Sequence, residues 1–247
     1  MNDFEITNEL YAALFCFTLI TSVFTAVLGQ GGGLMLMGVL AQFIPPTTLI
    51  PVHAVIQAAS NSSRAALSLK NINWSIITPI LVGVIIGGAL VSPFIAHINW
   101  DWMQLIIGLY ILWSVWGKEL KLKKNIQMSL GSLGFVQGSL GVLLGATGPL
   151  GNAILLAKGL NREQIIASNA VIMFSSHITK LIIFLMIGVV LSHYVYLLGL
   201  LSLAAILGSF IGSLLRPKIP EALFFRIFKI TLSLLAFRML YLGFIEL

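Results

Sequence analysis

The sequence predicts an all-α polytopic membrane protein made of two repeated halves, each with five helical segments. Of its 247 residues, 58% are hydrophobic and only 9% are charged, and the mean hydropathy is +1.02. The apolar residues form ten segments, and one pattern of glycine and polar residues occurs twice, 116 residues apart. A chain this apolar cannot bury its hydrophobic surface in a water-soluble core of ordinary size.

The repeated pattern begins with a glycine cluster and ends in a polar helix. Its first copy has the cluster Gly29 to Gly33 and the polar stretch His53 to Arg64, and its second copy has Gly145 to Pro149 and Asn169 to Lys180. A shared glycine break, a shared polar helix and a basic residue in register favour a duplication over chance. We therefore expect two halves, 1–117 and 126–247, joined by a basic cytoplasmic linker at 118–125.

The expected segments suggest how the chain crosses the bilayer. They fall at 10–28, 33–44, 51–69, 74–97, 100–117, 126–144, 150–160, 163–190, 193–215 and 222–244. A bilayer core requires about 20 helical residues, so the second and seventh segments are too short to span it alone.

Charge favours one way of counting the crossings. If each short segment changes sides, the Lys and Arg residues that flank the segments all fall on one face, which the positive-inside rule places in the cytoplasm. Both termini then lie outside, and the halves are inverted repeats. If the short segments continue the preceding helices, the repeats are four plus four and parallel, and the basic residues divide almost evenly between the faces. We prefer the first arrangement, in the inner cell membrane.

The glycine clusters predict broken helices. Glycine propagates a helix poorly, so the first helix should end near Gly29 and a short helix should begin near Leu34 with free amide groups. Free amides and the positive end of a helix dipole bind anions, and broken helices mark the binding sites of transporters. The alternative is that the glycines only permit close helix packing. The candidate binding residues in the two clusters are Gly29, Gly31, Gly32, Gly33, Thr147 and Gly148.

The polar helices supply the other candidate residues. A basic residue deep in a bilayer costs about 3 kcal/mol, so it normally faces a cavity or a partner. Because every Asp and Glu lies in a flank or loop, Arg64 and Lys180 indicate a path for an anion, unless both reach out to lipid headgroups. The two histidines can carry protons or act as neutral hydrogen-bonding groups. The candidates here are His53, Gln57, Asn61, Arg64, Asn169, Ser176, His177 and Lys180.

Several classes of protein are disfavoured. The sequence has no phosphate-binding loop, paired carboxylates or His/Cys metal cluster, so we expect no enzyme, metal or cofactor. The net charge of +6 belongs to residues at segment ends, so nucleic acid is not an expected partner. The single cysteine, Cys16, lies in the first apolar segment, where we expect a buried thiol. The expected partners are the lipid bilayer and a small anion, and a homo-oligomer remains open.

The glycine cluster, the Pro45-Pro46 turn, the His53 to Arg64 helix and their degenerate second copy resemble the TauE/SafE sulfite exporter family, over roughly Phe15 to Phe244. The resemblance implies a membrane permease with two related halves that handles sulfite, sulfonates or other small organosulfur and carboxylate anions. In the second copy, Asn169 replaces His53 and the cluster has fewer glycines, which predicts unequal halves. The resulting prediction is a secondary transporter of a small anion that works by alternating access. The alternatives are an anion channel and a membrane scaffold without transport.

Overall fold

The computed structural model describes residues 7–95, 97–98, 100–117, 129–218 and 221–245. These residues form helices and connecting turns, with no strand among them, which confirms the all-α prediction. The α-helices are α1 (Asn8–Leu28), α2 (Gly32–Leu40), α3 (Pro46–Leu67), α4 (Trp74–Ile95), α5 (Met103–Trp116), α6 (Leu130–Leu144), α7 (Gly148–Ala157), α8 (Arg162–Met186), α9 (Val195–Leu215) and α10 (Glu221–Ile245). Short 3-10 turns are η1 (Leu69–Asn71), η2 (Trp100–Trp102), η3 (Ser192–Tyr194) and η4 (Arg216–Lys218). The expected linker at 118–125 lies outside the described residues.

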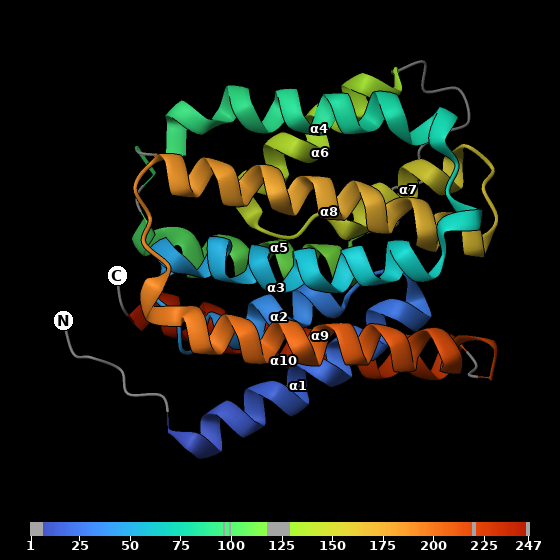
Figure 1. The fold of residues 1–247 in the computed structure, drawn as a ribbon. Helices are drawn as coiled ribbons and strands as arrows, with labels where there is room; N and C mark the ends of the chain where they lie inside the picture. The colour runs from blue at the N-terminus through green and yellow to red at the C-terminus, as the bar shows by residue number, and fades with distance from the viewer. Residues whose placement is uncertain (1–6, 96, 99, 118–128, 219–220, 246–247) are drawn as a thin grey trace.

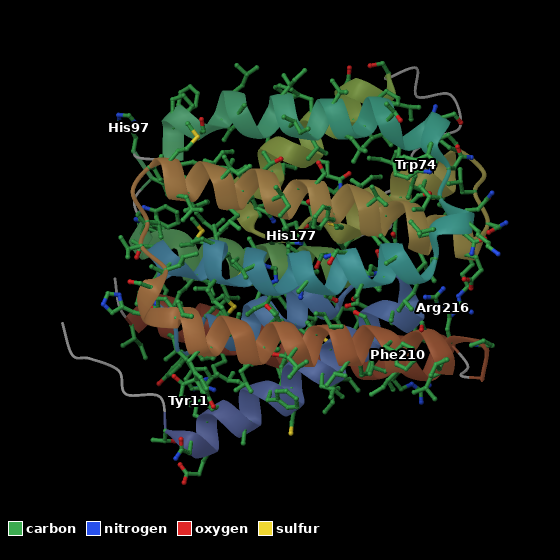
Figure 2. All side chains as sticks on the ribbon, in the orientation of Figure 1. Tyr11, Trp74, His97, His177, Phe210 and Arg216 are labelled. Carbon is green, nitrogen blue, oxygen red and sulfur yellow. The ribbon has the colours of Figure 1, made fainter. Side chains whose placement is uncertain are left out.

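The outer surface of the helix bundle is suited to lipid. Within the described residues, four stretches are long and apolar enough to cross a bilayer: Asn8–Leu28, Trp74–Ile95, Arg162–Met186 and Ser192–Leu215. Large apolar side chains point outward from α4, α9 and α10, and Phe210 on α9 is an example (Figure 2). Such a continuous apolar exterior marks a multi-pass membrane protein. Cys16 is exposed on this surface, so the expectation of a buried thiol is wrong.

The long helices lie roughly parallel to one axis, and α8 and α3 pack together in the middle (Figure 1). These two helices run in opposite directions. The N-terminal end of α1 lies at the same end of the bundle as the C-terminal end of α10. The basic residues Lys70, Lys158, Arg162 and Arg216 lie at the opposite end, where α3 and α9 finish and α4 and α8 begin. Figure 2 places Arg216 at that end and His97 at the other.

Helix boundaries correspond between the two halves that the sequence predicts. The helices α1 and α6 end at Leu28 and Leu144, α2 and α7 begin at Gly32 and Gly148, and α3 and α8 begin at Pro46 and Arg162, always 116 residues apart. The glycine that follows α1, Gly29, has a φ of 80°, and its counterpart after α6, Gly145, has a φ of 78°. Non-glycine residues rarely adopt this left-handed conformation, so the same local chemistry ends both helices.

The two halves interleave rather than standing apart. The first helix of each half packs on the fourth helix of the other, α1 on α9 and α6 on α4, while α3 packs on α8 and α5 on α10. Glycines bring the first two pairs into backbone contact. A Cβ atom on Gly138 of α6 would overlap the carbonyl oxygen of Val84, and one on Gly208 of α9 would overlap that of Leu19. Small residues permit this close approach in membranes.

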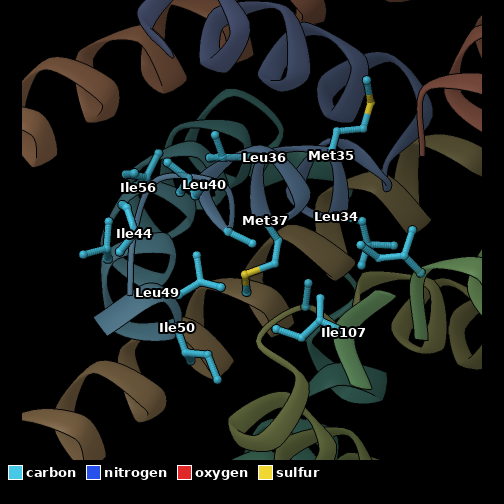
Figure 3. Packing of buried hydrophobic residues seen from close by; sticks show 14 of the residues in the cluster. Leu34, Met35, Leu36, Met37, Leu40, Ile44, Leu49, Ile50, Ile56 and Ile107 are labelled. Atoms are coloured by element: carbon cyan, nitrogen blue, oxygen red, sulfur yellow. The ribbon is translucent and has the colours of Figure 1, made fainter. Parts of the chain in front are cut away.

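The short helix α2 is surrounded by protein. Leu34, Leu36, Met37 and Leu40 are almost fully buried, and Figure 3 shows them among side chains of α3 and Ile107 of α5. A helix that is apolar on all sides belongs in the interior of a bundle. Its counterpart α7 is less covered, since Leu156 is exposed. The first broken helix therefore contributes more of the buried core than the second.

Candidate functional site

The two helix breaks meet at one small cavity in the middle of the bundle. Its volume is about 30 Å³, and its lining comes from α1, both glycine clusters, α3 and α8. Figure 2 shows His177, one of its lining residues, between α8 and α3. A groove of about 530 Å³ between α5 and α10 is larger, but its lining is almost wholly apolar and offers nothing to hold an anion.

The first break leaves the start of α2 open towards this cavity. Gly29 and Gly31 have φ values of 80° and 98°, which reverse the chain between α1 and α2. No side chain caps the beginning of α2, and Gly31, Gly33 and Leu34 line the cavity. The unpaired amide groups and the positive end of the helix dipole thus lie at the cavity wall.

The second break brings the start of α7 to the same cavity. Gly145 ends α6, and α7 begins at Gly148, two residues before the expected segment, with Pro149 in its first turn. No side chain caps this helix either, and the Thr147 hydroxyl is buried without a partner. Pro149 has no amide hydrogen, so this helix start offers fewer donors than the first.

The polar residues of α3 form one connected, buried face. The ring nitrogen Nε2 of His53 lies 2.8 Å from the carbonyl oxygen of Gly33, to which it donates. Asn61 Nδ2 donates to the carbonyl oxygen of Gln57 at 2.6 Å. Arg64 Nη1 donates to the carbonyl oxygen of Thr25 at 3.2 Å, Nη2 donates to Asn61 Oδ1, and Nε is buried without a partner.

Residues of α8 approach the cavity from the other side. Asn169 Nδ2 lies 3.3 Å from the carbonyl oxygen of Gly29 and 3.4 Å from that of Gly148, so this amide bridges the two breaks. Lys180 Nζ donates to the carbonyl oxygen of Gly145 at 2.5 Å. Arg64 and Lys180 are both buried, at 2% and 1% exposure, so neither side chain reaches the headgroups.

These bonds determine which charges face the cavity. The last carbonyl groups of α1 and α6 carry the negative ends of those helices, and Arg64 and Lys180 bind them. The positive ends of α2 and α7 have no comparable side-chain partner. With no acidic side chain in its lining, the cavity favours a negative ligand.

Most of the predicted site residues line this cavity. Those that do are Gly29, Gly31, Gly33, His53, Gln57, Asn61, Arg64, Thr147, Gly148, Asn169 and His177. Three lie just outside it. A Cβ on Gly32 would overlap the Thr21 carbonyl of α1, Ser176 faces Gly141 of α6, and Lys180 binds Gly145.

The cavity also contains residues that sequence reasoning did not select: Thr25, Gln30, Leu34, Ala146, Pro149 and Met173. Gln30 carried a readable signal, because it is a polar residue inside the first glycine cluster, whereas Thr25 is one of several hydroxyl residues in its segment. The apolar lining residues gave no such signal, because they stand among other apolar residues in the sequence.

A cluster of arginines binds the carbonyl groups at the end of α1, near the basic end of the bundle. Arg216 Nε donates to the carbonyl oxygen of Ala26 at 2.8 Å, and Arg162 Nη2 donates to that of Val27 at 2.9 Å. Arg216 also forms an ion pair with Glu163, with 2.6 Å between Nη1 and Oε2. Together with Arg64, these residues bind three successive carbonyl groups at the end of α1.

The chain resembles one known protein family over most of its length. The family model described as Sulfite exporter TauE/SafE matches residues 14–239. No curated protein and no solved structure shows a significant match.

Proposed function

Because the chain belongs to the TauE/SafE sulfite exporter family, we propose that it is a secondary transporter of a small anion. The substrate class is sulfite, a sulfonate, or a related organosulfur or carboxylate anion. The observation that carries the proposal is the central cavity, where two broken helices begin beside buried donors and no acidic side chain.

The dimensions of the cavity support a carrier cycle. A volume of about 30 Å³ holds about two water molecules, so a sulfite ion requires the helices around it to move apart. A narrow site that must widen around its ligand favours a carrier, because an open channel has a continuous wet path. Arg64 and Lys180 lie near the final turns of the antiparallel helices α3 and α8, towards opposite ends of the bundle. Each is placed to attract an anion when its own side opens.

The polar centre also argues against a scaffold without transport. Four buried polar atoms have no hydrogen-bond partner in the described part of the chain: Arg64 Nε, His53 Nδ1, His177 Nδ1 and Asn169 Oδ1. Each unsatisfied buried polar group costs about 1–3 kcal/mol, so a molecule that needed only packing would not place them together. A bound anion and its water would satisfy several of these groups.

Flux in vesicles tests the proposal. The purified protein in liposomes should move sulfite in a saturable manner, and a panel of sulfate, thiosulfate, sulfoacetate and small carboxylates would define its selectivity. Conductance far above carrier rates would indicate a channel. No flux of any of these anions would contradict the proposal.

The variant Arg64→Gln tests the site itself. Removing a charged hydrogen-bond donor should reduce sulfite affinity by roughly 10- to 100-fold, because hydrogen bonds to charged groups contribute about 1.5–3 kcal/mol. Arg238→Gln is the matched control, since Arg238 lies on α10, is exposed and does not line the cavity. Equal transport by both folded variants would place the substrate site elsewhere.

A further inference from the structure

The cavity contains two histidines that the anion site does not require as fixed donors. His53 on α3 and His177 on α8 face each other, with ring centroids 5.6 Å apart and planes inclined at 68°. Both are buried, both line the cavity, and the Nδ1 atom of each has no hydrogen-bond partner among the described residues. Two unpartnered ring nitrogens at the wall of one cavity need a chemical explanation.

The hydrogen bond of His53 fixes where its free lone pair lies. A carbonyl oxygen can only accept, so His53 Nε2 carries the hydrogen that is donated to Gly33. In the neutral ring, Nδ1 then holds a lone pair. That lone pair is buried, unpartnered and in a residue that lines the cavity, so it is a proton-binding site at the place where the anion would bind.

The charged surroundings decide when this site fills. His177 and Lys180 face His53 from α8, while His53, Arg64 and Lys180 surround His177. The parts of α1, α2 and α7 that line the cavity contribute no charged side chain, and neither do α4, α6 and α9, which pack on α3 or α8. In the empty cavity, a third positive charge beside Arg64 and Lys180 is strongly disfavoured. An anion between the same groups reverses this, because it stabilises an adjacent imidazolium.

We propose that the His53–His177 pair binds one proton together with the anion, so that the protein is a proton-coupled anion transporter. This inference rests on the proposed function and adds its coupling ion. The proton binds reversibly to one imidazole lone pair, and no covalent bond to the substrate forms. The doubly protonated pair is excluded by repulsion between two imidazolium rings at this distance. One proton per anion is therefore the expected stoichiometry.

Calorimetry of sulfite binding in buffers with different heats of protonation counts the protons taken up. The purified wild type should take up about one proton more per sulfite than either His53→Gln or His177→Gln, and His193→Gln should match the wild type because His193 is exposed at a helix end. Sulfite itself gains and loses a proton near neutral pH, so the measure that matters is the difference in proton uptake between wild type and variants. Equal proton uptake by all four proteins would overturn the proposal.

The pH dependence provides a second readout. Linkage of one proton to binding raises the affinity up to about tenfold for each unit by which the pH falls, and this part of the slope should be absent from the glutamine variants. If a variant binds too weakly for calorimetry, its sulfite flux in liposomes decides. An imposed proton gradient should accelerate wild type and His193→Gln but not the cavity variants. A gradient that acts on all four alike would mean that the proton travels on sulfite alone.

Failure of this proposal and failure of the proposed function give different results. Saturable sulfite flux without histidine-dependent proton uptake would leave an uncoupled anion transporter and reject the coupling. Absence of sulfite flux and binding in the wild type would reject both.

Discussion

Arg64 and Lys180 each combine two roles at the scale of a single residue. Both are buried cations, which are costly in a membrane unless they find a partner. Their partners are carbonyl groups at the ends of broken helices, Thr25 for Arg64 and Gly145 for Lys180. Carbonyl oxygens carry no formal charge, so the bond to Thr25 leaves the positive charge of Arg64 available to an anion nearby.

The glycines of the first cluster also differ from one another in role. Gly29 and Gly31 provide the left-handed backbone, Gly32 permits contact with the Thr21 carbonyl, and Gly33 lines the cavity beside Gln57. Sequence reasoning grouped all four as ligand-binding residues, since it could not separate packing from access. A substitution at Gly32 therefore tests folding, and one at Gly33 tests binding.

Gly33→Ala should weaken sulfite transport. The added Cβ would lie 3.2 Å from Gln57 Oε1, so it crowds the cavity and displaces that side chain. Gly148→Ala is the matched control in the second break, because its Cβ would lie 3.9 Å from Met173 Sδ, an ordinary contact. We expect the Michaelis constant for sulfite in liposomes to rise severalfold for Gly33→Ala and to change little for Gly148→Ala. The opposite order would make the second break the main anion site.

At the scale of the elements, the sequence predicted every long helix, because apolar runs bounded by glycine, proline and charge are strong signals. The start of α3 was misplaced, at 51 instead of Pro46, because Pro45-Pro46 was taken wholly as a turn although proline suits the first helical position. The near-complete burial of α2 and the partial exposure of α7 were not predictable. Both segments are short and apolar, and only the packing of distant helices distinguishes them.

The pairing of α4 with α6 depends on glycines that bring the two backbones together. A Cβ on Gly138 would overlap Val84, so Gly138→Ala should force these helices apart and destabilise the protein by about 1–3 kcal/mol. Gly199→Ala on α9 is the control, because nothing lies within 4 Å of its Cβ position and alanine favours a helix more than glycine. Unfolding of both variants in detergent, followed by circular dichroism, measures the difference. Equal stability would show that the α4–α6 contact relaxes freely.

At the scale of the whole molecule, the described basic residues and the helix directions support one orientation. Lys70, Lys158, Arg162 and Arg216 lie at one end of the bundle, at the turns after α3, α7 and α9 and at the start of α8. From the positive-inside rule we propose that this end faces the cytoplasm and that both termini lie outside. The same arrangement supports five plus five inverted repeats over four plus four parallel ones, since α3 and α8 are antiparallel.

Labelling of single cysteines tests this orientation. In a Cys16→Ser background, Ser192→Cys should react with an impermeant thiol reagent added to intact cells, and Ser75→Cys should react only after the membrane is opened. Both serines are exposed, and they lie at opposite ends of the bundle, before α9 and in the first turn of α4. Removing Cys16 is necessary because its thiol is exposed as well. Labelling of Ser75→Cys but not Ser192→Cys in intact cells would show that the protein has the opposite orientation in the membrane.

The interleaving of the halves makes a final prediction about assembly. Each half alone would expose the surfaces that α1 and α4 bury on α9 and α6, together with a polar helix that needs its counterpart, α3 or α8. Unpaired polar groups are costly in hydrocarbon, so neither 1–117 nor 118–247 should form a stable protein when expressed alone.

Expressed together, the two fragments should assemble and restore sulfite flux. The sulfite flux of the co-expressed fragments is best compared with that of the full chain cleaved between 118 and 125 after purification. The cleaved chain has also lost its connection but has already folded as one chain, so the comparison isolates the assembly step. A protease-resistant, monodisperse half that forms without its partner would show that the halves fold independently. It would also mean that the contacts between α1 and α9 and between α4 and α6 form only after each half has folded.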